Sequence, residues 1–128
     1  MISKEAKSIV EKSGDVLTDL IIDSIQDIKG KQIVKLDLRH LDYAPTNFFI
    51  ICEGESSTQI KAISDNIYRK VKDEMGITPN HTEGLGDAKW ILVDYFDIVV
   101  HVFYPETRSY YDLENLWSDA NRIKYEDL

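Results

Sequence analysis

Cysteine, proline and long apolar runs are scarce in this sequence. The 128 residues include one cysteine and three prolines, and no apolar run reaches the roughly 18 residues that a membrane span requires. The N-terminal residues MISKEAKSIVEKSG lack the apolar core of a secretory signal. Cys52 has no second cysteine to pair with and no metal-ligand spacing around it, so we expect it to be a small buried hydrophobic residue. These absences predict a soluble cytoplasmic protein.

Basic residues are outnumbered by acidic ones. Lys and Arg contribute 15 residues against 23 Asp and Glu, which gives a net charge of -8. Binding nucleic acid through its phosphates needs clustered Lys and Arg, so that class of partner is not expected. An acidic surface is compatible with a basic protein partner, but it also keeps a chain soluble without any partner. Charge therefore excludes more classes than it selects.

The length and composition indicate one globular domain. Apolar residues make up 43% of the chain and charged residues 30%, which is typical of a folded protein with a real core. The patterns follow the order helix, strand, strand, helix and then strands. We predict a single α/β domain with a mixed five-stranded sheet and helices packed on it. It divides into a helical segment 1–29, an α/β core 30–117 and a polar tail 118–128.

Periodicity places the first elements of this domain. A short charged helix over Ser3–Lys12 is followed by a break at Gly14 and Asp15, after which apolar residues resume at helical spacing. Gln32–Leu38 alternates and predicts a half-covered strand at an edge of the sheet. Phe48–Cys52 is apolar on both faces, as expected of a central strand.

The later elements have clear boundaries. A capping box of Ser56 and Gln59 opens a second amphipathic helix, which ends before Gly76. The segment Glu106–Trp117 predicts one or two helical turns. Its expected partly buried residues are Tyr111, Leu113, Leu116 and Trp117. The tail SDANRIKYEDL is polar and is expected to fray.

The stretch Lys89–Tyr104 predicts a β-hairpin at the centre of the protein. Two strands of period two, Lys89–Asp94 and Asp97–Tyr104, are separated by Tyr95 and Phe96. If these two residues form the loop, the register follows. Asp94 then faces Asp97, Leu92 faces Val99 and Trp90 faces His101 on one side, and Ile91 and Val93 face Val100 and Ile98 on the other. The second side is aliphatic and suits burial under helices, while the first is suited to present a surface.

A nucleotide site is one possible chemistry. The turn Gly54–Ser57 lies between a strand and a helix, as in nucleotidyl-transfer domains, where paired carboxylates further along hold magnesium. Those carboxylates are not found here, because Asp65 lies inside the helix and Asp94 and Asp97 belong to the hairpin turn. A capped helix after a central strand explains the same residues without a ligand.

Metal and thiol chemistry are also not expected. His81, Glu83 and His101 with Asp94 do not have the spacing of a compact zinc site, and strand rise separates Asp94 from the cross-strand partner of His101 by about 13 Å. The apolar neighbours of Cys52 raise a thiol pKa instead of activating it, so a Cys-His dyad is disfavoured. We therefore predict no cofactor and no metal.

Trp90 supports two interpretations. Tryptophans are usually mostly buried, so core packing explains it first. The other hairpin face already supplies an aliphatic core, however, and Trp90 lies with Leu92 and His101 near the acidic residues Glu83 and Asp87. A large aromatic residue with an acidic rim is typical of an interface that faces a basic partner.

Two long motifs give the sequence a family resemblance. The pattern EG-x5-WILVDY-x-DIVVHVF, followed by R-x-YYDLE-x-LW-x-DA, resembles the ribosomal silencing factor family, also called RsfS or Iojap. The earlier YAPTNFFIICEGESSTQIKAISDNI resembles the strand–GxS–helix segment of that family. The resemblance covers roughly Ile28 to Ala120. Two departures are Phe96-Asp97, where the family usually has Gly-Asp, and Gln59, where many relatives have an Arg-His or Arg-Gln pair.

The resemblance implies a fold and a function. It implies an α/β fold related to nucleotidyltransferases but without their catalytic acids, and a homodimer in many members. It also implies binding to the fourteenth protein of the large ribosomal subunit, at the face where the small subunit docks, so that subunit joining is blocked and translation is repressed. Trp90 matches the interface tryptophan of the family. Other matched positions, each interface or scaffold, are Asp94, His101, Arg108, Tyr111, Leu116 and Trp117.

Our main hypothesis is a ribosome-binding factor that is not an enzyme. The expected partner-binding residues are Trp90, Glu83, Asp87, Leu92, Asp94, His101, Arg108 and Tyr111. One alternative is an enzyme that acts on nucleotides at Gly54–Ser57, which a magnesium-dependent thermal shift with nucleoside triphosphates would detect. Another is a dimerisation module whose Trp90 face pairs with itself, which sedimentation of Trp90→Ala would reveal.

Overall fold

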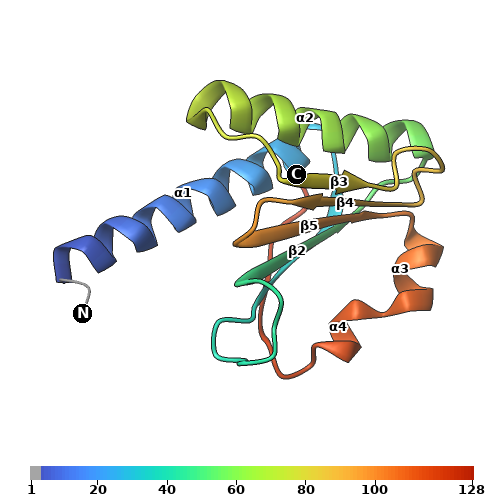
Figure 1. Ribbon diagram of the computed structural model, residues 1–128. Coiled ribbons are helices and arrows are strands. Elements are labelled where there is room, and N and C mark those ends of the chain that lie inside the picture. The colour runs from blue at the N-terminus through green and yellow to red at the C-terminus, as the bar shows by residue number, and fades with distance from the viewer. Residues whose placement is uncertain (1–3) are drawn as a thin grey trace.

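The computed structural model describes the backbone of residues 4–128 and the side chains of residues 16–128. Within this part of the chain there are four helices and six strands (Figure 1). In chain order they are α1 (Lys4–Asp27), β1 (Lys31–Asp37), β2 (Phe48–Glu53), α2 (Ser57–Met75), β3 (His81–Glu83), β4 (Trp90–Asp94), β5 (Ile98–Phe103), α3 (Pro105–Tyr111), α4 (Leu113–Leu116) and β6 (Asn121–Lys124). This arrangement confirms the predicted α/β class.

The strands form one mixed sheet in the order β3-β4-β5-β2-β1-β6. Strands β2 and β5 run parallel at its centre, and every other neighbouring pair is antiparallel. Strand β2 is central and its core residues are buried from both sides, as its apolar run predicted.

The sheet has six strands where we expected five. The additional strand, β6, lies in the tail that we expected to fray, and it pairs with β1 from Val34↔Lys124 to Asp37↔Asn121. Strand β1 is therefore not at an edge. All four residues of β6 are exposed, so the pairing depends on main-chain hydrogen bonds, which leave no apolar alternation for a sequence pattern to detect.

The first helix is continuous where we expected a break. Helix α1 runs through Gly14 and Asp15 to Asp27. A glycine inside a helix costs only about 1 kcal/mol relative to alanine, so Gly14 does not have to end it. Ser3, the predicted start of the first helical piece, lies outside the described residues.

Helix α2 is capped as predicted. The backbone N–H of Gln59 donates to Ser56 Oγ at 3.1 Å, and Gln59 Oε1 accepts from the N–H of Glu55 at 2.7 Å. Gly76 ends the helix in the left-handed conformation, with φ of 67°. The Gln59 amide also donates to the carbonyls of Ile28 and Lys29, at 3.1 and 3.2 Å, and so joins the start of α2 to the end of α1.

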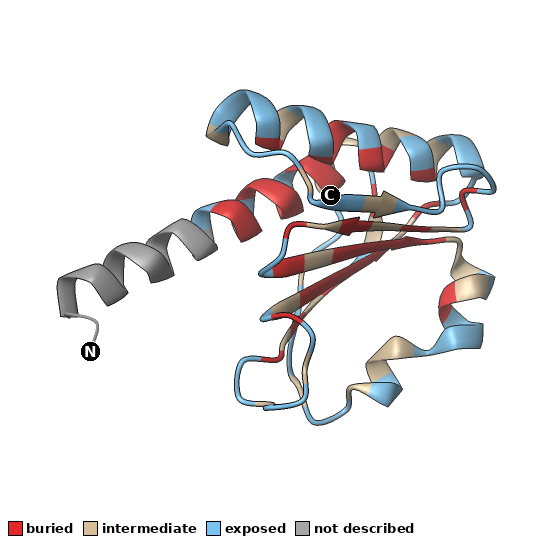
Figure 2. Ribbon diagram, in the orientation of Figure 1, coloured by how far each residue is buried: buried red, intermediate tan, exposed pale blue. Residues whose placement is uncertain are grey.

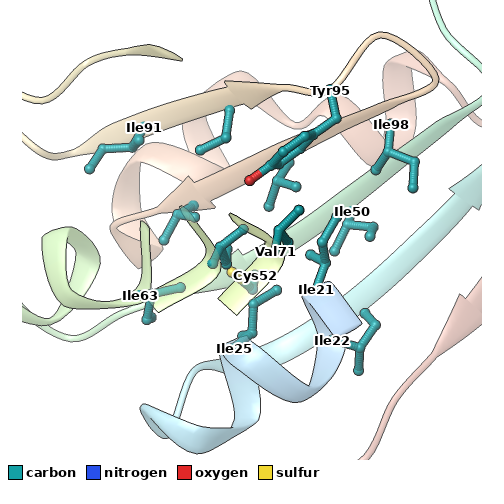
Figure 3. Packing of buried hydrophobic residues seen from close by; sticks show 14 of the residues in the cluster. Ile21, Ile22, Ile25, Ile50, Cys52, Ile63, Val71, Ile91, Tyr95 and Ile98 are labelled. Atoms are coloured by element: carbon teal, nitrogen blue, oxygen red, sulfur yellow. The ribbon is translucent and has the colours of Figure 1, made fainter. Parts of the chain in front are cut away.

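Helices α1 and α2 cover one face of the sheet with a large aliphatic core. Figure 2 shows α2 buried toward the sheet and exposed on its opposite side. In Figure 3 Ile21 and Ile25 of α1 and Ile63 of α2 lie against the sheet residues Ile50 and Cys52. Cys52 is fully buried, and burial raises the pKa of its thiol to about 12. It is a core residue, as expected.

The opposite face holds a second, smaller core under α3 and α4. Its buried members are Val34, Leu36, Leu38, Phe49, Ile51 and Phe103. Leu113 and Trp117 are half-buried against it, as predicted, but Tyr111 and Leu116 expose 51% and 72% of their surface. The reason is Asp112, whose φ of 48° ends α3 and changes the helical phase before α4 begins.

The hairpin forms with a register two residues away from the predicted one. Trp90 pairs with Phe103, Leu92 with His101 and Asp94 with Val99, and the loop is Phe96-Asp97. Phe96 takes the positive φ of 69° that this turn requires. The alternation of apolar and polar residues fixes which side chains share a face, whereas the position of the loop depends on whether Phe96 can adopt a positive φ. A shift of two keeps every side chain on its predicted face.

Candidate functional site

Six side chains of β3, β4 and β5 form a face that the small core leaves accessible. Cross-strand pairing brings His81 beside Asp94, Glu83 beside Leu92, and Asp94 beside Val99. Alternation adds Trp90 to the same side, next to Leu92. We call His81, Glu83, Trp90, Leu92, Asp94 and Val99 the open face. Each of the six is exposed or half-buried, and four of them were predicted site residues.

Trp90 contacts the small core on one side of its ring and is exposed to solvent on the other. Its Nε1–H donates to His101 Nδ1 at 3.1 Å. Its ring lies 4.9 Å from the Phe103 ring centroid and 4.8 Å from that of Tyr111. The indole is half-buried: one side packs on the core and the other is exposed, which is compatible with both interpretations of Trp90.

His101 lies beneath the open face. It exposes 4% of its surface and contacts the Phe49 ring edge-on at 4.7 Å. Burial lowers the pKa of His101 to about 4, so the ring is neutral near pH 7. Since Nδ1 accepts from Trp90, the proton lies on Nε2, which has no hydrogen-bond partner within the described residues.

The acidic residues surround the apolar centre of the open face. Glu83 is exposed and its Oε1 lies 2.6 Å from His81 Nε2. Asp94 is half-buried, and its Oδ1 accepts from the backbone N–H of Phe96 at 2.7 Å. Asp87 is exposed in the loop before β4, at the Trp90 end. The three predicted acids therefore border Trp90 and Leu92.

Arg108 is directed into the protein. It exposes 8% of its surface, and its guanidinium donates to both carboxylate oxygens of Glu114, at 2.8 and 3.1 Å. It also donates to the carbonyl of Gln32 at 2.7 Å and to Glu53 at 3.3 Å. Burial raises the pKa of Glu114, but the hydrogen bonds and charge of Arg108 outweigh this effect and hold it below its ordinary value. Arg108 thus fastens α3 and α4 to β1 and β2.

A groove of about 490 Å³ extends from Trp90 toward α3. It is lined by Gly84, Asp87, Lys89, Trp90, Glu106, Thr107, Tyr110 and Tyr111. Asp87, Trp90 and Tyr111 were predicted, and the structure adds Glu106 and Tyr110. The signal for Tyr110 was the repeated tyrosine in RSYYD, but only the fold shows that its ring lies beside the groove.

At the turn Gly54–Ser57, part of the hydrogen-bonding capacity that a nucleotide would need is already used within the protein. The N–H groups of Glu55 and Gln59 are already bound within the capping box. Glu53, which precedes the turn, pairs with Arg108. In the described part of the chain we find no cluster of His, Cys, Asp and Glu able to hold a metal ion, and none of its helices could cross a membrane.

Comparison with known proteins gives consistent matches. Residues 11–128 match the family model described as "Ribosomal silencing factor during starvation". The ribosomal silencing factor RsfS of Halalkalibacterium halodurans is 39% identical over 116 residues, which cover 91% of this chain and 97% of that protein. A crystal structure from Chromobacterium violaceum superposes with a TM-score of 0.77 at 38% identity, and covers 81% of this chain and 85% of that one.

A more distant relative comes from mouse. The "Mitochondrial assembly of ribosomal large subunit protein 1" of Mus musculus is 26% identical over 106 residues. This match covers 78% of this chain but only 44% of the mouse protein.

Proposed function

The chain belongs to the family of ribosomal silencing factors that act during starvation, and we propose that it represses translation by binding the large ribosomal subunit in the cytoplasm. It acts by binding and not by catalysis. The bound protein occupies the face where the small subunit docks, so subunit joining is blocked. The mouse relative named for large-subunit assembly supports the choice of subunit.

The open face is the observation that carries this proposal. Trp90, Leu92 and Val99 are half-buried apolar residues, and Glu83 and Asp94 lie beside them. An apolar centre with a polar rim is the usual form of a protein interface. The acidic rim and the net charge of -8 favour a basic partner. We propose that this partner is the fourteenth protein of the large subunit.

The predicted site residues divide into two roles. The accessible ones contact the partner, and they are Trp90, Leu92, Glu83, Asp87, Asp94 and Tyr111. His101 and Arg108 are buried, so they act by holding other residues in place. His101 orients the Trp90 ring through its hydrogen bond, and Arg108 holds α3, which carries Tyr111 against Trp90.

Co-sedimentation with purified ribosomal subunits tests the proposal. We expect the protein to pellet with the large subunit and not with the small one. Trp90→Ala should lose this binding and retain its fold. Tyr68→Ala is the matched control, because Tyr68 is an exposed aromatic residue on α2, on the opposite side of the sheet.

Two results would contradict the proposal. Failure of the wild-type protein to pellet with any particle would exclude ribosome binding. A collapse of the melting temperature in Trp90→Ala would show that this residue serves the core. We further propose a homodimer, and sedimentation velocity of wild type and Trp90→Ala will show whether the open face is also its self-association surface.

A further inference from the structure

The groove beside Trp90 is lined by three aromatic side chains that contact one another. Trp90 and Tyr111 have ring centroids 4.8 Å apart at an angle of 48°, and Tyr110 meets Tyr111 edge-on at 5.0 Å. Tyr110 and Tyr111 expose 82% and 51% of their surface. Large aromatic rings so exposed in one hollow are unusual for a folded chain and indicate a binding surface. Rings at several angles suit a cation, which is attracted to aromatic faces.

Two carboxylates at the groove have no partner of their own. Asp87 and Glu106 both line it and both are exposed. Neither carboxylate makes a hydrogen bond or ion pair within the described residues. Lys89 is the one basic residue of the lining, so the acids are in excess. This charge disfavours a phosphate and favours a positively charged group.

The walls of the groove are fixed before any partner arrives. A side chain at Gly84 would place its Cβ 1.9 Å from the carbonyl oxygen of Trp90, so the loop before β4 lies directly against that strand. The N–H of Ala88 closes this loop on the Gly84 carbonyl at 3.0 Å. Arg108 fastens the other wall, α3, through Glu114. A preformed site loses less entropy when it is filled.

We propose that this groove receives one arginine side chain of the protein partner. The inference rests on the proposed function and names the chemical group that the groove next to the open face recognises. Arginine suits the groove better than lysine, because its planar guanidinium stacks on aromatic rings while it donates to carboxylates at its edge. Trp90 and Tyr111 supply the rings, and Asp87 and Glu106 supply the acceptors.

A small-molecule probe tests the groove without the ribosome. We expect N-acetyl-arginine amide at millimolar concentration to shift the NMR signals of the Trp90, Tyr110 and Tyr111 rings. The neutral isostere N-acetyl-citrulline amide is the matched ligand and should leave them unchanged. The double variant Asp87→Asn/Glu106→Gln should abolish the arginine response. Equal shifts with both ligands, or none with either, would overturn the proposal.

Binding to large subunits gives the second test. The same double variant should bind at least tenfold more weakly than wild type, whereas Asp65→Asn, an equivalent change on the exposed side of α2, should not. Lys89→Met should bind more tightly, because it removes the competing cation. If Trp90→Ala loses binding and the double variant binds like wild type, the groove proposal fails and the proposed function stands. If the wild-type protein binds no subunit, the proposed function is wrong, and the NMR experiment alone tests whether the groove binds arginine.

Discussion

Phe96 has a left-handed backbone conformation, which residues with a side chain adopt at an energetic cost. Its φ is 69° and it exposes 69% of its surface. The turn is fixed by two hydrogen bonds: the N–H of Phe96 donates to Asp94 Oδ1, and Thr46 Oγ1 donates to the Phe96 carbonyl. We predict that Phe96→Gly raises the free energy of unfolding by up to about 1 kcal/mol, because glycine takes this conformation freely. Urea unfolding measures this change. A less stable variant would show that the exposed ring has a packing role.

The same variant also tests the open face. Phe96 lies at the tip of the hairpin and outside the open face, so binding to the large subunit should be unchanged in Phe96→Gly. Weaker binding would extend the interface to the hairpin tip.

The buried His101 should make stability depend on pH. Burial lowers the pKa of His101 to about 4 from its ordinary 6.5, so between these values the unfolded chain binds a proton that the folded protein does not. Stability therefore falls as pH falls through this window. The loss approaches about 3 kcal/mol near pH 4. Unfolding in urea across this pH range measures it.

His101→Asn is the matched variant for that measurement. The asparagine oxygen can accept from Trp90 Nε1, as Nδ1 does, but the side chain does not titrate. Carboxylates titrate in both proteins, so their contribution cancels in the difference. We expect the difference in stability between wild type and His101→Asn to change with pH between about 6.5 and 4. Parallel curves would contradict the buried, neutral histidine.

At the level of single residues, the sequence predicts the face of the sheet on which a side chain lies better than it predicts how far that side chain is buried. Alternation correctly placed Trp90, Leu92 and Asp94 on one face, and this result survived an error of two residues in the register. The same alternation put His101 on that face but did not show that it is buried. Its burial depends on Phe49 of β2, which contacts its ring but is distant in sequence, so no local periodic signal reports it.

Arg108 connects α3 and α4 to the sheet. Glu53 and Glu114, both half-buried, pair with it. Arg108→Ala therefore leaves Glu53 without its ion-pair partner and Glu114 with Arg122 alone, at 3.4 Å. We predict a loss of about 3 kcal/mol in the free energy of unfolding, the lower end of the range for breaking a buried pair, because both carboxylates are partly exposed. Arg108→Ala/Glu114→Ala should recover part of this loss, because it removes one of the two carboxylates that lose Arg108. Chemical denaturation of both variants measures the difference.

The Arg108 variants also separate a structural role from direct contact with the partner. If Arg108 only holds α3 in place, the double variant should recover subunit binding along with stability. Recovered stability without recovered binding would mean that Arg108 itself contacts the partner, which its 8% exposure argues against.

Strand β6 protects an edge that would otherwise attract other chains. It covers β1, whose remaining hydrogen-bonding groups would be open to solvent without it. A chain that ends at Ala120 should be less stable and should self-associate, because an unpaired inner strand is a template for another strand. A chain that ends at Tyr125 keeps β6 and is the control. Size-exclusion chromatography and thermal melting compare the two.

The helices and strands differ in how well the sequence predicts them. Helix α2 has caps at both ends, and β2 has an apolar run, so both were placed from local pattern alone. Strand β6 has neither: its residues Asn121–Lys124 are exposed, and only its partner β1 defines it. The prediction of a break at Gly14 was wrong for a related reason: the low helix propensity of one glycine is too weak to end the helix.

For the whole molecule, long motifs carried more information than composition. Net charge argued against binding nucleic acid through its phosphates, but it did not choose between a basic partner and solubility alone. The motifs from Ile28 to Ala120 indicated the family, and the family model extends that match to residues 11–128. The groove was not predicted, because α3 and the loop before β4 are separated by the whole of the hairpin and meet only in the folded chain.

The acidity of the chain gives a final prediction about the complex. If acidic residues at the open face meet a basic partner, affinity for the large subunit should fall as salt rises from about 0.05 M to about 0.3 M, because salt screens exposed charges. Asp87→Asn should bind more weakly at low salt and show a smaller slope. Trp90→Ala should weaken binding at every salt concentration without changing the slope, since it removes apolar contact. Asp65→Asn on the opposite side should match wild type, and an affinity independent of salt would mean that docking depends on the apolar centre alone.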